Sequence, residues 1–127
     1  MDQSLESALQ RGGIVDITTT GRKSGTARRI EIYFHNLDGR YYITGRPGFS
    51  RDWIANLVAD PAMTVHFKRG LTHDLAAIAD VITDRDEKRR VIGRVRVESW
   101  GVDPAEVEAD IEHWVETSPL IEFRPAG

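Results

Sequence analysis

The strongest constraint on the fold is a pair of strand-like segments joined by a short basic loop. Residues 14–20 are rich in β-branched side chains, and apolar residues alternate with polar or aromatic ones through residues 29–35. A two-residue period places neighbouring side chains on opposite faces of a strand. The Asp38-Gly39 pair then signals a tight hairpin before a third strand at residues 41–44. The chain therefore begins as an antiparallel meander with one buried face.

Caps, breakers and periodicity predict the remaining elements. We expect helices over residues 4–10, 50–60, 85–100 and 104–118, and strands over residues 63–68, 74–83 and 120–124. Short antiparallel strands with helices in their connections indicate an α+β fold, either a small barrel or a strongly curved sheet.

Helical spacing also predicts which side chains of these helices are buried. In the second helix the predicted apolar stripe is Trp53, Ile54, Leu57 and Val58. In the third, Ser99 follows Val91, Ile92 and Val95 at the same spacing. Trp53 and Trp100 are interpreted as core residues, whereas Trp114 is left open between the core and a ligand pocket.

Composition excludes several classes of function. With 127 residues the chain fits one domain. Its 17 basic and 20 acidic residues leave a net charge of −3, so the overall charge does not indicate binding to nucleic acid or an anionic membrane. The absence of cysteine excludes disulfides and thiolate chemistry. No apolar run is long enough to span a membrane and the first residues do not resemble a signal peptide, so we expect a soluble cytoplasmic protein.

The loop between the first two strands predicts a site for an anion. It contains Gly21, Arg22, Lys23, Ser24 and Gly25, and two further arginines follow at positions 28 and 29. Glycine permits positive φ and can turn backbone N–H groups toward a ligand, while arginine and lysine bind phosphate or carboxylate. A solvated basic hairpin is the alternative. The order of residues does not match a P-loop or a dinucleotide-binding fingerprint.

A second loop, Gly45-Arg46-Pro47-Gly48, precludes regular structure. Ser50 is then interpreted as the N-cap of a helix whose first turn contains Asp52, and a helix N-terminus also attracts anions.

No metal-binding or hydrolytic motif is present. The histidines are dispersed at positions 35, 66, 73 and 113, without the spacing of metal ligands. No Ser-His-Asp order and no paired carboxylates favour hydrolysis.

Taken in order, these motifs resemble the deazaflavin-dependent nitroreductase and quinone reductase family, which uses coenzyme F420 on a split β-barrel. The resemblance covers residues 14–68 and is carried by residues 18–25 with Arg28, by residues 42–48, and by residues 53–61. It implies an antiparallel six-stranded, FMN-binding-like barrel with flanking helices. The loop cations would hold the phosphate and acidic tail of the deazaflavin, and the second loop would line its ring. The implied cofactor-binding residues are Gly21, Arg22, Lys23, Ser24, Gly25, Arg28, Gly45, Arg46, Pro47, Gly48, Ser50, Arg51, Asp52 and Trp53.

The implied activity is hydride transfer from reduced coenzyme F420 to a quinone, nitro or enone-type acceptor. The chain departs from the family at Gly45, where many relatives carry Ser or Ala, and at Arg46, where many carry Lys. Its last helix has Ile111, His113 and Trp114 where characterised reductases carry tyrosines, so no catalytic residue is assigned. FMN as the cofactor, or a non-catalytic protein that binds a cofactor or lipid-like ligand, stay open. A homodimer is expected by analogy with other split barrels.

Overall fold

The fold is built around a closed antiparallel β-barrel, seen in a computed structural model that describes residues 3–47 and 51–127. The strands are hydrogen-bonded in the order β1-β2-β3-β6-β5-β4, which confirms the predicted six-stranded barrel. Each strand therefore has a hydrogen-bonded neighbour on both sides. The strands are β1 Gly13–Thr20, β2 Ala27–Leu37, β3 Arg40–Thr44, β4 Ala62–Phe67, β5 His73–Val81 and β6 Leu120–Pro125.

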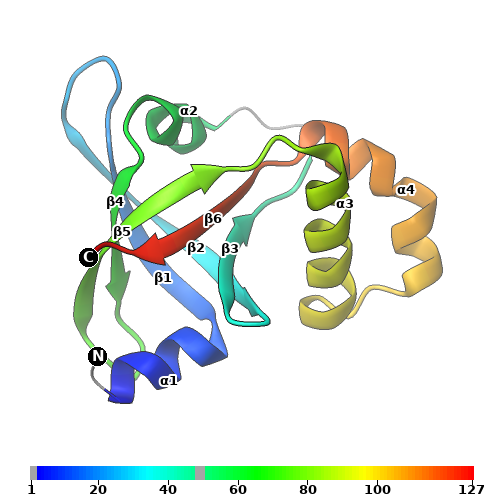
Figure 1. The fold of residues 1–127 in the computed structure, drawn as a ribbon, viewed down its shortest axis with the longest axis horizontal. Coiled ribbons are helices and arrows are strands. Elements are labelled where there is room, and N and C mark those ends of the chain that lie inside the picture. The colour runs from blue at the N-terminus through cyan, green and yellow to red at the C-terminus, as the bar shows by residue number, and fades with distance from the viewer. Residues whose placement is uncertain (1–2, 48–50) are drawn as a thin grey trace.

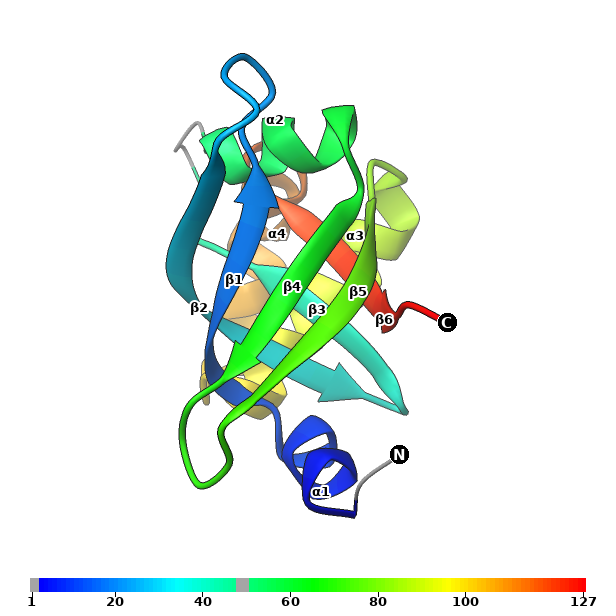
Figure 2. The same ribbon diagram turned by 90° about the vertical axis from the view of Figure 1, so that its left-hand side faces the viewer.

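Helices cover both ends and one side of the barrel. Figure 1 shows α3 and α4 as an antiparallel pair at one side, with α1 and α2 at opposite ends. The loop between β1 and β2 projects beyond the same end that α2 covers (Figure 2). The helices are α1 Gln3–Arg11, α2 Asp52–Ala59, α3 Arg85–Arg94 and α4 Pro104–Thr117, and a π-helical turn, η1 Val95–Ser99, extends α3.

The hairpin between β2 and β3 forms where the Asp-Gly pair predicts it. Asp38 and Gly39 both have positive φ, 57° and 86°, as a two-residue turn of this kind requires. The Gly39 N–H donates to Asn36 Oδ1 at 2.9 Å. The register that follows pairs Leu37 with Arg40.

Two apolar clusters hold these layers together. The barrel interior is filled by side chains such as Ile17, Val65 and Ile121, each fully buried. A second cluster lies between the α3–α4 pair and the outer wall of β3 and β6, and it includes Tyr42 and Leu120. Where the helices cover the wall, strands are buried on both faces, so the prediction of one buried face is wrong at that end of the meander.

Three side chains are exposed although the sequence predicts Val58 and Ser99 on apolar faces and Trp100 in the core. Val58 is 69% exposed because the short α2 buries Asn56 and Leu57 against the barrel and turns Val58 to solvent. Ser99 and Trp100 are also exposed. The π-helical turn adds a residue to the helical period, so the face predicted from Val91 onward does not continue to Ser99.

The start of α2 differs from the prediction as well. Its N-cap is Arg51, whose side chain makes no capping hydrogen bond. Ser50 and Gly48, two predicted site residues, lie outside the described residues. Trp53 is partly buried and packs against the barrel core, in line with its interpretation as a core residue.

Candidate functional site

The basic loop between β1 and β2 is closed by its own hydrogen bonds. The Gly21 N–H donates to Thr26 O at 2.8 Å, and the Gly25 N–H donates to Gly21 O at 2.8 Å. The Thr26 N–H donates to Ser24 Oγ at 3.1 Å. Gly25 has φ +70°, where glycine is favoured. These backbone donors serve the loop itself, so anion binding by the loop depends mainly on its cationic side chains.

Arg22 fastens this loop to α2. Its backbone N–H and its Nη1 both donate to Asn56 Oδ1, at 3.1 and 3.0 Å, and its Nη2 lies 3.6 Å from Asp52 Oδ1. Asn56 is 3% exposed and donates from Nδ2 to Thr19 Oγ1 at 3.4 Å. Arg22 therefore positions the loop rather than presenting a free charge. Sequence reasoning missed Asn56, whose signal was an amide in the middle of a short apolar helix.

A cavity of about 560 Å³ opens beside the loop, and we call it the cationic cavity. Its lining residues are Thr19, Gly21, Arg22, Lys23, Ser24, Arg28, Arg29, Ile30, Asp52, Trp53 and Asn56. The structure thus brings together most of the predicted tail-binding residues, with Gly25 adjacent and not in the lining.

The cations of this cavity differ in how far they are neutralised. Arg29 Nε donates to Asp16 Oδ2 at 2.9 Å, and Arg22 pairs with Asp52. Lys23 and Arg28 form no ion pair with any carboxylate in the described parts of the chain. These two side chains are therefore the ones available to an anionic ligand.

The second loop is held by the residue that begins α2. Arg51 Nη2 donates to Arg46 O at 2.9 Å, so the guanidinium folds back over the bend. A Cβ on Gly45 would lie 2.7 Å from the same nitrogen, so a larger residue there would displace the guanidinium. Both loops are thus attached to the first turns of α2, one through Arg51 and the other through Asn56.

A second cavity, of about 610 Å³, lies beside this bend, and we call it the tryptophan cavity. Its lining residues among those described are Gly45, Arg46, Pro47, Trp100 and Trp114. The two indole rings lie 5.8 Å apart between centroids, tilted by 55°. The predicted ring-binding residues 45–47 therefore line a different cavity from the tail-binding residues, and Trp100, predicted in the core, lines it as well.

A buried histidine lies behind this cavity. The His35 ring is 5.9 Å from that of Trp100, and its Nδ1 is 3.2 Å from Ser99 Oγ. Burial lowers the pKa of His35 to about 4, because a charged imidazole would lose its hydration there. His35 is uncharged at neutral pH and forms part of the packed wall.

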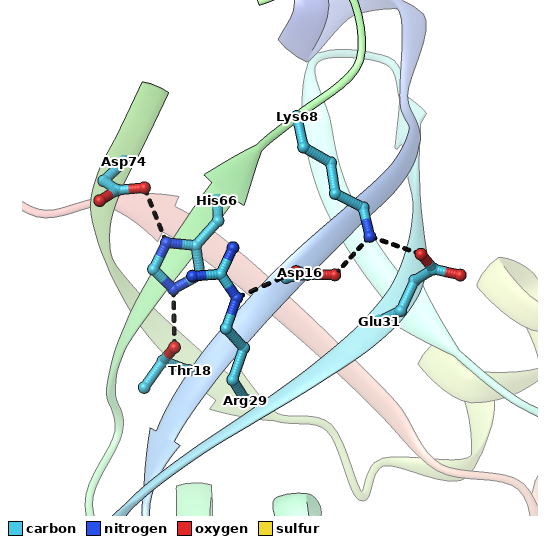
Figure 3. A network of polar contacts seen from close by, with 7 residues as sticks. All are labelled: Asp16, Thr18, Arg29, Glu31, His66, Lys68 and Asp74. Carbon is cyan, nitrogen blue, oxygen red and sulfur yellow. Dashed lines mark hydrogen bonds and ion pairs between the residues drawn. The ribbon is translucent and has the colours of Figure 1, made fainter. Parts of the chain in front are cut away.

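A polar network covers the outer wall of β1, β2, β4 and β5 (Figure 3). His66 bridges Thr18 Oγ1, at 2.6 Å from Nε2, and Asp74 Oδ1, at 2.7 Å from Nδ1. That order resembles a hydrolytic triad, but Thr18 and His66 line neither cavity described above. Beside it, hydrogen bonds from Lys68 and Arg29 lower the pKa of Asp16. We interpret the network as cross-strand stabilisation.

Neither a metal site nor a membrane-spanning helix is found among the described residues. Across residues 3–47 and 51–127, no group of His, Asp and Glu side chains is arranged to hold a metal ion. None of the helices in those ranges has the length and apolar character needed to cross a bilayer.

Comparisons with known proteins place this architecture. Among solved structures, a conserved hypothetical protein from Mycobacterium tuberculosis is 14% identical with a TM-score of 0.75, and the match covers 100% of this chain and 82% of that one. An F420-H2 dependent reductase is 24% identical with a TM-score of 0.60, covering 88% and 94%. A pyridoxinephosphate oxidase family protein from Clostridium acetobutylicum is 13% identical with a TM-score of 0.64, covering 96% and 81%. At these identities the structures support the split-barrel fold.

The family comparison is more specific than the structural one. A comparison with curated proteins finds no match. The model of the F420H(2)-dependent quinone reductase family matches residues 3–117, which include both loops, both cavities and all four α-helices. The chain therefore belongs to the F420H(2)-dependent quinone reductase family.

Proposed function

We propose that this protein transfers a hydride from reduced coenzyme F420 to a quinone, nitro or enone-type acceptor. Family membership makes coenzyme F420 the cofactor and reduction the class of reaction. When bound, the deazaflavin supplies the hydride, and the protein contributes binding, orientation and exclusion of water.

The residues of the cationic cavity fit the anionic tail that the resemblance implies. Lys23 and Arg28 carry charges without carboxylate partners, so they bind phosphate and carboxylate groups without first breaking an ion pair. Arg22 holds the loop in place through Asn56. In this proposal Arg22 is a positioning residue, and Lys23 and Arg28 are the direct ligands.

The observation that carries the proposal is the shared attachment of both loops to α2. An elongated cofactor with a charged tail and a flat ring needs two binding loops at a fixed separation. Asn56 holds the loop of the cationic cavity, and Arg51 holds the bend of the tryptophan cavity. We place the ring along residues 45–47 and the acceptor between that bend and the tryptophans.

The source of the proton that completes acceptor reduction is also part of the proposal. The described lining residues of the tryptophan cavity include no carboxylate, histidine or tyrosine. Trp100, at its edge, is 40% exposed. These observations favour water as the proton donor, in place of a tyrosine on the last helix.

We further propose a cytoplasmic homodimer. Cell fractionation tests the location, and light scattering tests the oligomeric state.

Titration of the purified protein with coenzyme F420, followed by fluorescence, tests the proposal. We expect binding at micromolar coenzyme, and turnover of the reduced form with at least one member of a panel of quinones, nitro compounds and enones. Lys23→Ala and Arg28→Ala should each weaken binding by roughly 1–3 kcal/mol, the range for charge-assisted hydrogen bonds. The control is Arg124→Ala, which removes an exposed pair with Asp80 between the neighbouring strands β5 and β6, outside the lining of both cavities.

Other results of the titration and turnover assay would point to other functions. Absence of binding at micromolar coenzyme would overturn the proposal. Tight binding without turnover on the whole panel would indicate a non-catalytic cofactor-binding protein, and a protein that is yellow as purified would indicate FMN.

A further inference from the structure

Trp114, one wall of the tryptophan cavity, is held by contacts that leave its ring little freedom. The Arg96 guanidinium carbon lies 4.2 Å from the centroid of the ring. The indole Nε1 donates to Asp110 Oδ2 at 3.3 Å. A cation stacked on an indole is favourable, and the hydrogen bond fixes the rotation of the ring in its plane. The cavity is therefore lined by an aromatic surface whose position is set before any ligand arrives.

Arg96 is itself an unusual residue for a helix interface. It is 5% exposed, and its Nη1 and Nη2 donate to Asp110 Oδ1 and Oδ2 at 2.6 and 3.2 Å. Taking the charge of an arginine out of water costs free energy even when an exposed carboxylate such as Asp110 pairs with it. The exposed pair of Arg89 with Glu112, at 2.7 Å, also joins α3 to α4. Linking the two helices therefore does not require a buried arginine, and its contact with Trp114 is what distinguishes Arg96.

The π-helical turn determines where these side chains lie. The Trp100 N–H donates to Val95 O at 3.1 Å, five residues earlier, as a π-helix requires. Over the same turn Arg96 is buried, whereas Trp100 is exposed and lines the cavity. Such turns cost stability relative to an α-helix and occur frequently at functional sites. Here the turn gives the cavity the Trp100 indole and the guanidinium that supports Trp114 of α4.

We propose that Arg96 and Asp110 are positioning residues that fix the Trp114 ring, and that this fixed ring determines how strongly the tryptophan cavity prefers flat aromatic acceptors to non-aromatic ones. Aromatic rings stack best in a few offset or tilted geometries, so a fixed indole favours a flat partner. A mobile indole would lose rotamer freedom on binding, which lowers affinity. The inference relies on the proposed function only in treating the ligand as the electron acceptor.

Binding of 2-methyl-1,4-naphthoquinone in the absence of reduced coenzyme tests the inference. Quenching of tryptophan emission and equilibrium dialysis follow binding, with and without oxidised coenzyme F420, which has no hydride to give. We expect saturable binding of the naphthoquinone, and at least tenfold weaker binding of the non-aromatic 2-cyclohexen-1-one.

Variants separate positioning from general stability. Arg96→Met and Asp110→Asn should each weaken naphthoquinone binding about 3–10-fold, while cyclohexenone and coenzyme binding stay unchanged. Arg96→Lys should behave like Arg96→Met, because an ammonium cannot stack on the ring and bind both carboxylate oxygens. Arg89→Met is the matched control, since it removes an arginine–carboxylate pair between the same helices outside the cavity, and it should bind normally.

Several outcomes would overturn the inference. The first is wild-type affinity for the naphthoquinone in both Arg96→Met and Asp110→Asn. The second is an equal loss of naphthoquinone affinity in Arg89→Met. The third is a wild-type protein that binds the coenzyme but not the naphthoquinone. The last outcome would leave the proposed function intact. Naphthoquinone binding without coenzyme binding would instead overturn the proposed function and leave the aromatic site. Should Arg96→Met fail to fold, Asp110→Asn decides, because Asp110 is about half exposed and tolerates the change.

Discussion

Arg22 donates twice to a single oxygen of Asn56, from its backbone N–H at 3.1 Å and from its guanidinium at 3.0 Å. The two residues are 34 positions apart, and they join the loop of the cationic cavity to the helix that covers one end of the barrel. The position of the loop therefore depends on a buried amide outside it. We expect loss of this amide to affect both the stability of the fold and the affinity for the coenzyme.

Asn56→Ala should lower the free energy of unfolding by about 1–3 kcal/mol, because it leaves the Arg22 N–H without its partner next to a buried position. Coenzyme affinity should fall in the same variant. Urea denaturation and coenzyme titration measure the two effects. Gln10→Ala, which truncates an exposed amide on α1, is the control and should change neither. A stability loss below about 0.5 kcal/mol would contradict the stabilising role of the Arg22–Asn56 hydrogen bonds.

Two glycines with the same φ allow steric crowding to be separated from backbone strain. Gly12 and Gly101 both have φ +67°, but a Cβ on Gly12 would lie 2.8 Å from Phe34 O, whereas nothing lies within 4 Å of one on Gly101. Gly101→Ala should cost about 1–2 kcal/mol for the left-handed conformation alone. Gly12→Ala should cost at least about 1 kcal/mol more, since backbone atoms must move. Equal thermal unfolding free energies in the two variants would show that the clash relaxes without cost.

Local chemistry explains which parts of this fold could be predicted. The Asp38-Gly39 turn and the caps of α3 and α4 depend on neighbours in sequence. Asp84 accepts from the Glu87 N–H at 2.9 Å, and Asp103 accepts from the Ala105 N–H at 2.8 Å, as their positions predict. Alternation likewise predicted the strands, although several boundaries differ by one or two residues.

The missed features depend on contacts that no local pattern encodes. The exposure of Trp100 and the burial of Arg96 follow from a π-helical turn, which shifts the helical register without a proline or glycine to mark it. Asn56 contacts a loop that precedes it by the whole β2–β3 hairpin and the second loop. The motifs located the binding loops, but only the tertiary structure reveals that they line two cavities and that α2 connects them.

The buried His35 predicts a dependence of stability on pH. Its pKa is about 4 in the folded protein against 6.5 ordinarily, so between these values the unfolded chain binds a proton that the folded protein does not. Stability is therefore lost as the pH falls from about 6.5 toward 4, by about 2 kcal/mol between pH 7 and pH 5. Urea denaturation at the two pH values measures the loss.

His35→Gln should remove most of this pH dependence, whatever its effect on stability at pH 7. Carboxyls with a lowered pKa, such as Asp16 and Asp38, change the free energy of unfolding only below about pH 4, because the stability they contribute is lost as the pH falls through the folded pKa. His113→Gln, at an exposed position on α4, is the control and should keep the wild-type dependence. An unchanged slope in His35→Gln would show that the imidazole is already protonated in the fold at pH 5.

Gly45 and Arg51 should behave as one unit in coenzyme binding. A Cβ on Gly45 would lie 2.7 Å from Arg51 Nη2 and 3.0 Å from its Cζ, so Gly45→Ala displaces the guanidinium from Arg46 O. Arg51→Met removes the same hydrogen bond from the other side. Each variant should weaken coenzyme binding several-fold, with a change in unfolding free energy of at most about 1–2 kcal/mol, because the contact is exposed.

The double variant distinguishes a shared contact from two separate effects. When two residues act through one contact, losing the second adds little to losing the first, and the interaction energy of the cycle is about as large as either single effect. Gly45→Ala/Arg51→Met should therefore bind the coenzyme about as well as the weaker single variant. Additive losses would mean that Gly45 and Arg51 contact the cofactor independently, and that the bend is not held to α2 through this arginine.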